Sequence, residues 1–175
     1  MVEVAVHTFI SAPRDDIFEF VNDMSARLAF LDHFAHEYRL TRPRSAGVGA
    51  AARYRLDAQP LFTHYTETAI VEVEEPRRIV ERGEAGRYGR IRTGTRWDFT
   101  REGTSVTRVD FLHWLDRGMP RERVKLRLGF EGWLRRQEKT ALERLRLIFE
   151  EPPQGPLARA TIAAFEPDKA VRFGS

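Results

Sequence analysis

The chain has 175 residues, 42% hydrophobic and 31% charged, a balance that predicts one folded domain and excludes an intrinsically disordered chain. It contains no cysteine, which excludes disulfides, thiol nucleophiles and cysteine-ligated metals, and its formal charge of only +3 gives little support for nucleic-acid binding. No apolar run approaches the roughly 20 residues that span a bilayer, and residues 1–10 lack the features of a signal peptide, so we expect a cytoplasmic protein.

The N-terminal part of the chain predicts a strand followed by two short helices. Apolar and polar residues alternate over residues 2–10, which is the period of a half-buried strand. A proline in a first-turn position opens a helix expected over residues 13–21. Ser25 is placed to cap a second short helix with apolar residues at 28, 30 and 31.

A period of two returns at His36, and Gly and Pro at turn positions divide the following sequence into six further strands. We expect these strands near 36–42, 49–57, 62–74, 78–83, 88–100 and 104–114. In the strand over 88–100, Trp97 and Phe99 share one face while Arg96 and Asp98 share the other. The pattern predicts an antiparallel sheet with one covered face and one wet face on which charges pair.

Gly118 and Pro120 end the strand pattern and open a long helix that we expect to continue to Glu150. A stripe at 3–4 spacing runs along this helix, formed by Phe130, Leu134, Gln137, Ala141, Leu145 and Ile148. About thirty helical residues would extend roughly 45 Å, which is enough to cross a sheet. The basic residues of this helix alternate with glutamates, Glu138 among them, and we interpret them as a solvated face.

Two prolines at 152 and 153 end the helix and define the predicted domain organisation. We assign residues 1–150 to one domain and residues 151–175 to a C-terminal tail. A partly ordered terminus, a flap over the domain and a homodimer contact remain open for this tail.

The order of elements is that of the helix-grip fold, an α+β architecture. The opening segment VHTFISAPRDDIFEFVND at 6–23 resembles the start of the START/Bet v 1-like superfamily (SRPBCC), in particular its bacterial polyketide cyclase/dehydrase and lipid-transport branch. The segments EEPRRIV at 74–80 and GTRWDFT at 94–100 lie where that family places them. The resemblance covers about residues 2–150. It implies a seven-stranded curved sheet and a long helix that enclose a cavity for a lipid, a quinone or a polyketide-like molecule.

Candidate ligand-binding residues are small, aromatic or polar side chains on the faces that we assign to the interior. A polar side chain buried without a partner costs about 1–3 kcal/mol, so polar residues within apolar faces are informative. Small side chains and two helix glycines, Gly129 and Gly132, would leave space between helix and sheet. The predicted site consists of Tyr65, Glu67, Thr95, Trp97, Phe111, His113, Phe130, Trp133 and Gln137. An ordinary aromatic core without a cavity is the alternative.

Three functions remain open from the sequence. The first is binding or transport of a hydrophobic small molecule in the cavity. The second is a polyketide cyclase/aromatase, with His113 or Glu67 as the general base beside a carbonyl and Tyr65 as the donor to the enolate. The third is an interaction module in which the basic helix face contacts a ribosome or a membrane.

We expect no cofactor and no metal. The Gly47-Val48-Gly49 segment lacks the preceding strand and the following helix of a dinucleotide site. His33 and His36 lie at a predicted helix-to-strand boundary, where we interpret them as surface residues.

Overall fold

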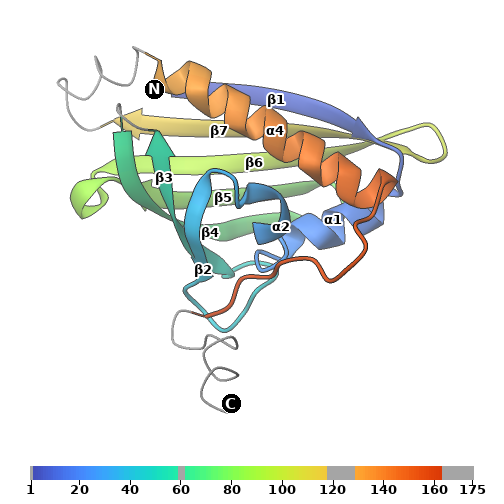
Figure 1. Cartoon of the computed structure of the whole chain (residues 1–175), viewed down its shortest axis with the longest axis horizontal. Helices are drawn as coiled ribbons and strands as arrows, with labels where there is room; N and C mark the ends of the chain where they lie inside the picture. Colours follow the sequence, from blue (N-terminus) through green and yellow to red (C-terminus); the bar gives the residue numbers. More distant parts are fainter. Residues whose placement is uncertain (1, 59–61, 118–128, 163–175) are drawn as a thin grey trace.

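A single antiparallel sheet crossed by one long helix forms the framework of the protein (Figure 1). The computed structural model describes residues 2–58, 62–117 and 129–162. The strands are β1 (Val2–Ile10), β2 (Ala35–Leu40), β3 (Ala51–Ala58), β4 (Phe62–Glu74), β5 (Arg78–Ala85), β6 (Ile91–Glu102) and β7 (Val106–Arg117). Their order is β1-β7-β6-β5-β4-β3-β2, so β1 and β2 form the two edges. The seven expected strands and the α+β helix-grip fold class are confirmed.

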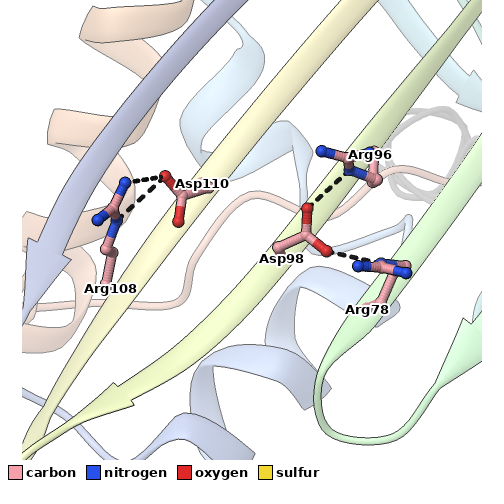
Figure 2. Close-up of polar contacts among 5 residues, drawn as sticks. All are labelled: Arg78, Arg96, Asp98, Arg108 and Asp110. Atoms are coloured by element: carbon pink, nitrogen blue, oxygen red, sulfur yellow. Dashed lines mark hydrogen bonds and ion pairs between the residues drawn. The ribbon is translucent and has the colours of Figure 1, made fainter.

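The two faces of the sheet differ in the way that the alternation in β6 and β7 predicts. Trp97 pairs with Phe111 across the two strands, and both side chains are buried on the inner face. On the outer face, Asp98 accepts hydrogen bonds from the Nε atoms of Arg78 at 2.6 Å and Arg96 at 2.7 Å (Figure 2). Figure 2 also shows the Arg108–Asp110 ion pair, at 2.7 Å. The predicted wet, charge-paired face is therefore confirmed.

The short helices cover one end of the inner face. They are α1 (Arg14–Asn22) and α2 (Leu28–Leu31), and a 3-10 turn, η1 (Arg87–Gly89), precedes β6. Helix α2 begins later than expected. Ser25 does not cap it, because the Ser25 amide and hydroxyl both donate to Asp23 Oδ1.

Helix α4 (Phe130–Glu150) lies across the inner face of the sheet, along β1 (Figure 1). It buries one face against the sheet, formed by Phe130, Leu134, Glu138, Ala141, Leu142 and Leu145. The expected helical residues before Phe130 fall in 118–128, outside the described residues. Glu138, predicted to be solvated, is 2% exposed, because its position belongs to the buried stripe.

The two helix glycines do not create space next to the sheet, contrary to expectation. Gly129 is the N-cap of α4, with a φ of 113°, a conformation that favours glycine. Gly132 lies on the exposed side of the helix, and an added Cβ there would meet only Arg136 Nη1, at 3.8 Å.

The described part of the C-terminal tail, residues 151–162, runs back along the domain to β2 (Figure 1). Ala160 N donates to Ser25 O at 2.8 Å, and Leu40 N donates to Thr161 O at 2.9 Å. This segment therefore covers the free edge of β2, whose backbone groups would otherwise be unpaired. In the described parts of the chain, no helix is long and apolar enough to cross a membrane.

Candidate functional site

A small cavity lies between the inner face of the sheet and α4. Its apolar walls come from α2, β3, β6, β7, α4 and the turn before β2, and include Leu31, Phe34, Leu56, Trp97, Phe111 and Leu142. The space open to the centre of a water molecule is about 40 Å³. One water molecule needs about 10–15 Å³, so the cavity holds about three waters as it stands, and a ring-sized ligand would require its walls to move apart. It is smaller than the elongated cavity expected from the sequence, because aromatic rings fill the interior: those of Trp97 and Phe111 are 4.2 Å apart.

A buried ion pair joins the turn before α2 to the centre of the sheet. Arg27 Nη1 donates to Glu81 Oε1, and each side chain is only 3% exposed. Arg27 Nε donates to Val21 O at 2.7 Å, and Trp97 Nε1 donates to Glu81 Oε1 at 3.2 Å. Burial is the largest single effect and opposes the positive charge, but Glu81, together with smaller effects of Tyr38 and Tyr54, raises the pKa of Arg27. Both residues line the cavity.

A second buried polar pair lies on the α4 side of the cavity. His113 Nδ1 is 2.6 Å from Glu138 Oε1, and His113 Nε2 is 3.0 Å from Thr93 Oγ1. The side chains of His113 and Glu138 are 5% and 2% exposed. Burial raises the pKa of Glu138, and the proximity of His113 lowers it by a smaller amount.

The hydrogen-bond geometry assigns the protons of this pair. Thr93 Oγ1 is 3.2 Å from the backbone oxygen of Trp114, which can only accept, so the single hydroxyl proton points there. His113 Nε2 therefore carries a hydrogen that Thr93 accepts. One further proton lies between His113 Nδ1 and Glu138 Oε1, and the pair has no net charge whichever of the two atoms holds it.

Three polar atoms in the cavity wall have no hydrogen-bond partner among the described residues. They are Arg27 Nη2, Thr95 Oγ1 and Glu138 Oε2. All three are buried, and each would cost about 1–3 kcal/mol if nothing met it. An apolar cavity with a few convergent polar groups is the general form of a small-molecule site.

Four of the predicted site residues come together in the cavity wall: Thr95, Trp97, Phe111 and His113. Phe130 and Trp133 stack on each other at 5.6 Å but do not line the cavity. Gln137 is half-buried, and its backbone oxygen lies 3.1 Å from His33 Nε2. On α4, the buried face includes Glu138 and not Gln137.

Tyr65 and Glu67 lie outside the cavity, and their predicted inward orientation is wrong. Both are exposed on the outer face of β4, where Tyr65 OH donates to Glu37 Oε2 at 2.6 Å. The inner phase of β4 belongs to the buried residues His64, Thr66 and Thr68. Polar residues occupy both phases of this strand, so the alternation does not decide which phase faces the core.

Sequence reasoning missed Arg27, Glu81 and Glu138 as cavity residues. A signal was present for Glu81, which occupies the buried phase of β5 between Ile79 and Ala85. Arg27 lies in a turn and has no such periodic signal. For His33 and His36, the structure shows no cluster of three or more potential metal ligands within its described ranges.

Several solved protein structures have the same fold as this chain. No protein-family model and no curated protein sequence matches the chain. The aromatase/cyclase Zhui from Streptomyces sp. R1128 superposes with a TM-score of 0.65 at 12% identity, over 82% of this chain and 90% of its own. A START superfamily protein from Mycobacterium smegmatis gives 0.61 at 14% identity, over 85% and 99%. Truncated norcoclaurine synthase from Thalictrum flavum gives 0.64 at 12% identity, over 85% and 93%.

The sheet, the crossing helix and the cavity between them define a helix-grip protein. The chain has the fold of the START/Bet v 1-like superfamily, as the opening segment and the order of elements predict. At these identities the likeness concerns the fold, and the site of this chain has to be interpreted from its own residues.

Proposed function

We propose that the protein binds a small, largely apolar molecule in the cavity between the sheet and α4. The observation that carries this proposal is the presence of three buried polar atoms, on Arg27, Thr95 and Glu138, that have no partner in the described structure and belong to an apolar wall. A ligand that meets them offsets their desolvation, while the aromatic walls contribute apolar contact.

Two proteins of the same fold have names that describe reactions of small molecules, an aromatase/cyclase and a norcoclaurine synthase. Their names support small-molecule binding as the use of this fold. The cavity of this chain has room for only a few waters, so a single ring already requires its walls to move, and a lipid, quinone or polyketide would have to displace side chains such as Trp97 and Phe111.

Catalysis has less support than binding. Both ring nitrogens of His113 are already hydrogen-bonded, and Tyr65 and Glu67 lie on the opposite face of the sheet. Of the acid–base groups in the cavity wall, Glu138 has a buried oxygen free to meet a ligand. A cyclase/aromatase would therefore depend on Glu138.

The interaction-module alternative also has less support. Three of the four arginines of α4, Arg135, Arg144 and Arg146, are paired with acids, as in Arg135–Glu131 at 3.2 Å and Arg144–Asp32. Such a face has little unpaired positive charge for RNA or anionic lipid.

The binding proposal is tested with phenol as a neutral, ring-sized probe, titrated into ¹⁵N-labelled protein while the Trp97 Nε1–H signal is followed. Ala141 lines the cavity from α4 and is 3% exposed, whereas the neighbouring Thr140 is exposed. We expect Ala141→Leu, which fills the space, to weaken phenol binding at least about tenfold, and Thr140→Leu to leave it unchanged. Equal binding by the two variants, or no shift of Trp97 in the unmodified protein, would contradict the proposal.

A second measurement tests whether the purified protein contains a natural ligand in the cavity. Freshly purified protein and protein extracted with organic solvent are compared by native mass spectrometry. We expect an additional mass of a small organic molecule in the fresh sample, and its absence from Ala141→Leu.

A further inference from the structure

The polar groups of the cavity form one row across three neighbouring strands. Glu81 of β5 pairs with Thr95 of β6, and Thr95 pairs with His113 of β7. Arg27 bonds to Glu81 at one end of the row, and Glu138 bonds to His113 at the other. Directly opposite residues lie about 5 Å apart in an antiparallel ladder, so the row spans about 10 Å between its outer backbones.

The two ends of the row present opposite hydrogen-bonding characters. At one end, Arg27 Nη2 can donate a hydrogen bond but cannot accept one. Glu138 Oε2 is an acceptor, because the shared proton of this pair lies between His113 Nδ1 and the other carboxyl oxygen, Oε1. Thr95 Oγ1, between the two ends, can do either. All three atoms are buried in the cavity wall and have no partner among residues 2–58, 62–117 and 129–162.

The charges of the row are balanced without a ligand. Arg27 and Glu81 neutralise each other as an ion pair, and His113 and Glu138 share one proton with no net charge. A carboxylate or an ammonium group entering this space would lose its hydration and meet no unpaired opposite charge. Burial of such an uncompensated charge is strongly unfavourable.

We infer that the ligand of this cavity is an uncharged, ring-sized molecule with a carbonyl-type acceptor at the end that meets Arg27 and a hydroxyl donor at the end that meets Glu138. The inference rests on the proposed function and adds the polarity and the charge of the ligand to it. A para-disubstituted ring has its two polar groups at opposite ends of the molecule, in the same order as the donor and the acceptor of the row.

Four compounds of nearly equal size separate the contributions. 4-Hydroxyacetophenone, at a pH where its phenol is protonated, has both the acceptor and the donor. 4-Methylacetophenone lacks the donor, 4-ethylphenol lacks the carbonyl, and 4-hydroxybenzoate replaces the neutral carbonyl group by a charged carboxylate. Dissociation constants are measured by the shift of the Trp97 Nε1–H signal, which reports from the cavity wall.

We expect 4-hydroxyacetophenone to bind about tenfold more tightly than each of the other three. Glu138→Leu removes the acceptor, and in this variant the advantage over 4-methylacetophenone should disappear. Glu138→Gln keeps an amide oxygen facing the ligand while its NH₂ donates to His113 Nδ1, so this matched variant should retain most of the advantage. The unmodified protein alone decides the result if Glu138→Leu does not fold.

The outcomes distinguish the two proposals. Equal binding of all four compounds, or tightest binding of 4-hydroxybenzoate, would overturn the inference and leave small-molecule binding in place. If no compound shifts Trp97, both the inference and the proposed function are wrong.

Discussion

Arg27 and Glu81 show how one buried pair both organises the cavity and makes the fold sensitive to mutation. Taking two charges out of water costs several kcal/mol, which their attraction and the hydrogen bonds from Trp97 and to Val21 O offset. Removal of one partner leaves the other charge buried and unpaired. Replacement of both by apolar residues removes the two desolvation costs together.

We expect Arg27→Met to lower the free energy of unfolding by about 3–5 kcal/mol, and the double variant Arg27→Met with Glu81→Leu to recover most of that loss. Urea unfolding followed by circular dichroism measures both. The exposed pair Arg135–Glu131 is the control, and Arg135→Met should cost no more than about 1 kcal/mol. Additive losses in the double variant would show that the pair is not coupled.

The lowered pKa of the buried His64 makes the free energy of unfolding depend on pH. Burial, with a smaller effect from His113, lowers the pKa of His64 from 6.5 to about 3. Between these values the unfolded chain binds a proton that the folded chain does not bind. The contribution of His64 to stability is therefore complete above about pH 6.5 and is lost as the pH falls toward 3, with a slope of at most about 1.4 kcal/mol per pH unit.

We expect His64→Leu to reduce the loss of stability between about pH 7 and pH 4.5. Urea midpoints at several pH values measure this slope. His36→Leu, at an exposed histidine, should keep the slope of the unmodified protein. An unchanged slope in His64→Leu would show that other groups cause the acid sensitivity.

Among the secondary-structure elements, the buried face of a strand was predicted correctly where apolar and polar residues alternate clearly. In β6, buried and charged residues take separate phases, as Trp97 and Asp98 show, and the predicted faces are correct. In β4, Tyr65 and Glu67 occupy one phase and His64 and Thr66 the other, so both phases are polar. Pairing with β3 and β5 then determines which phase faces the core.

Two glycines in different elements give opposite predictions for the same substitution. Gly132→Ala in the exposed face of α4 meets only the end of the Arg136 side chain, at 3.8 Å, and should stabilise the protein by about 0.5–1 kcal/mol, because glycine is a poor helix former. Gly83→Ala in β5 would place a Cβ 1.9 Å from the backbone oxygen of Glu67, and should destabilise the protein by about 1–3 kcal/mol or more. Thermal unfolding ranks the two variants, and a stable Gly83→Ala would show that β4 can move away from β5.

At the scale of the whole molecule, the C-terminal segment closes an edge that the sheet leaves open. Among the described strands, β2 has a neighbour on one side only, and its Leu40 amide donates to Thr161 O. The Ala160–Ser25 hydrogen bond fixes the same segment to the turn before α2. The segment therefore supports the part of the chain that contains Arg27.

We expect a chain that ends at Gly155 to lose about 1–2 kcal/mol of stability and to exchange its Leu40 amide hydrogen faster. Hydrogen exchange measured by NMR tests both statements at one residue. Arg159→Ala removes an ion pair with Asp23 and a 3.4 Å hydrogen bond to Ser25 Oγ; because this arginine is 61% exposed, the Leu40 exchange rate should change little. Unchanged protection of Leu40 in the shortened chain would mean that this segment does not hold the edge.

The α+β class, the seven strands and the crossing helix could be predicted from the sequence, as could four cavity residues, Thr95, Trp97, Phe111 and His113. These follow from local periodicity, which the chain shows wherever apolar and charged residues take separate phases. The tertiary structure alone decided the size of the cavity, the inward turn of Glu138 and the meeting of Arg27 with Glu81, which are 54 residues apart. The physical reason is that periodicity records which side of an element is buried, whereas partners and remaining space depend on how distant elements pack.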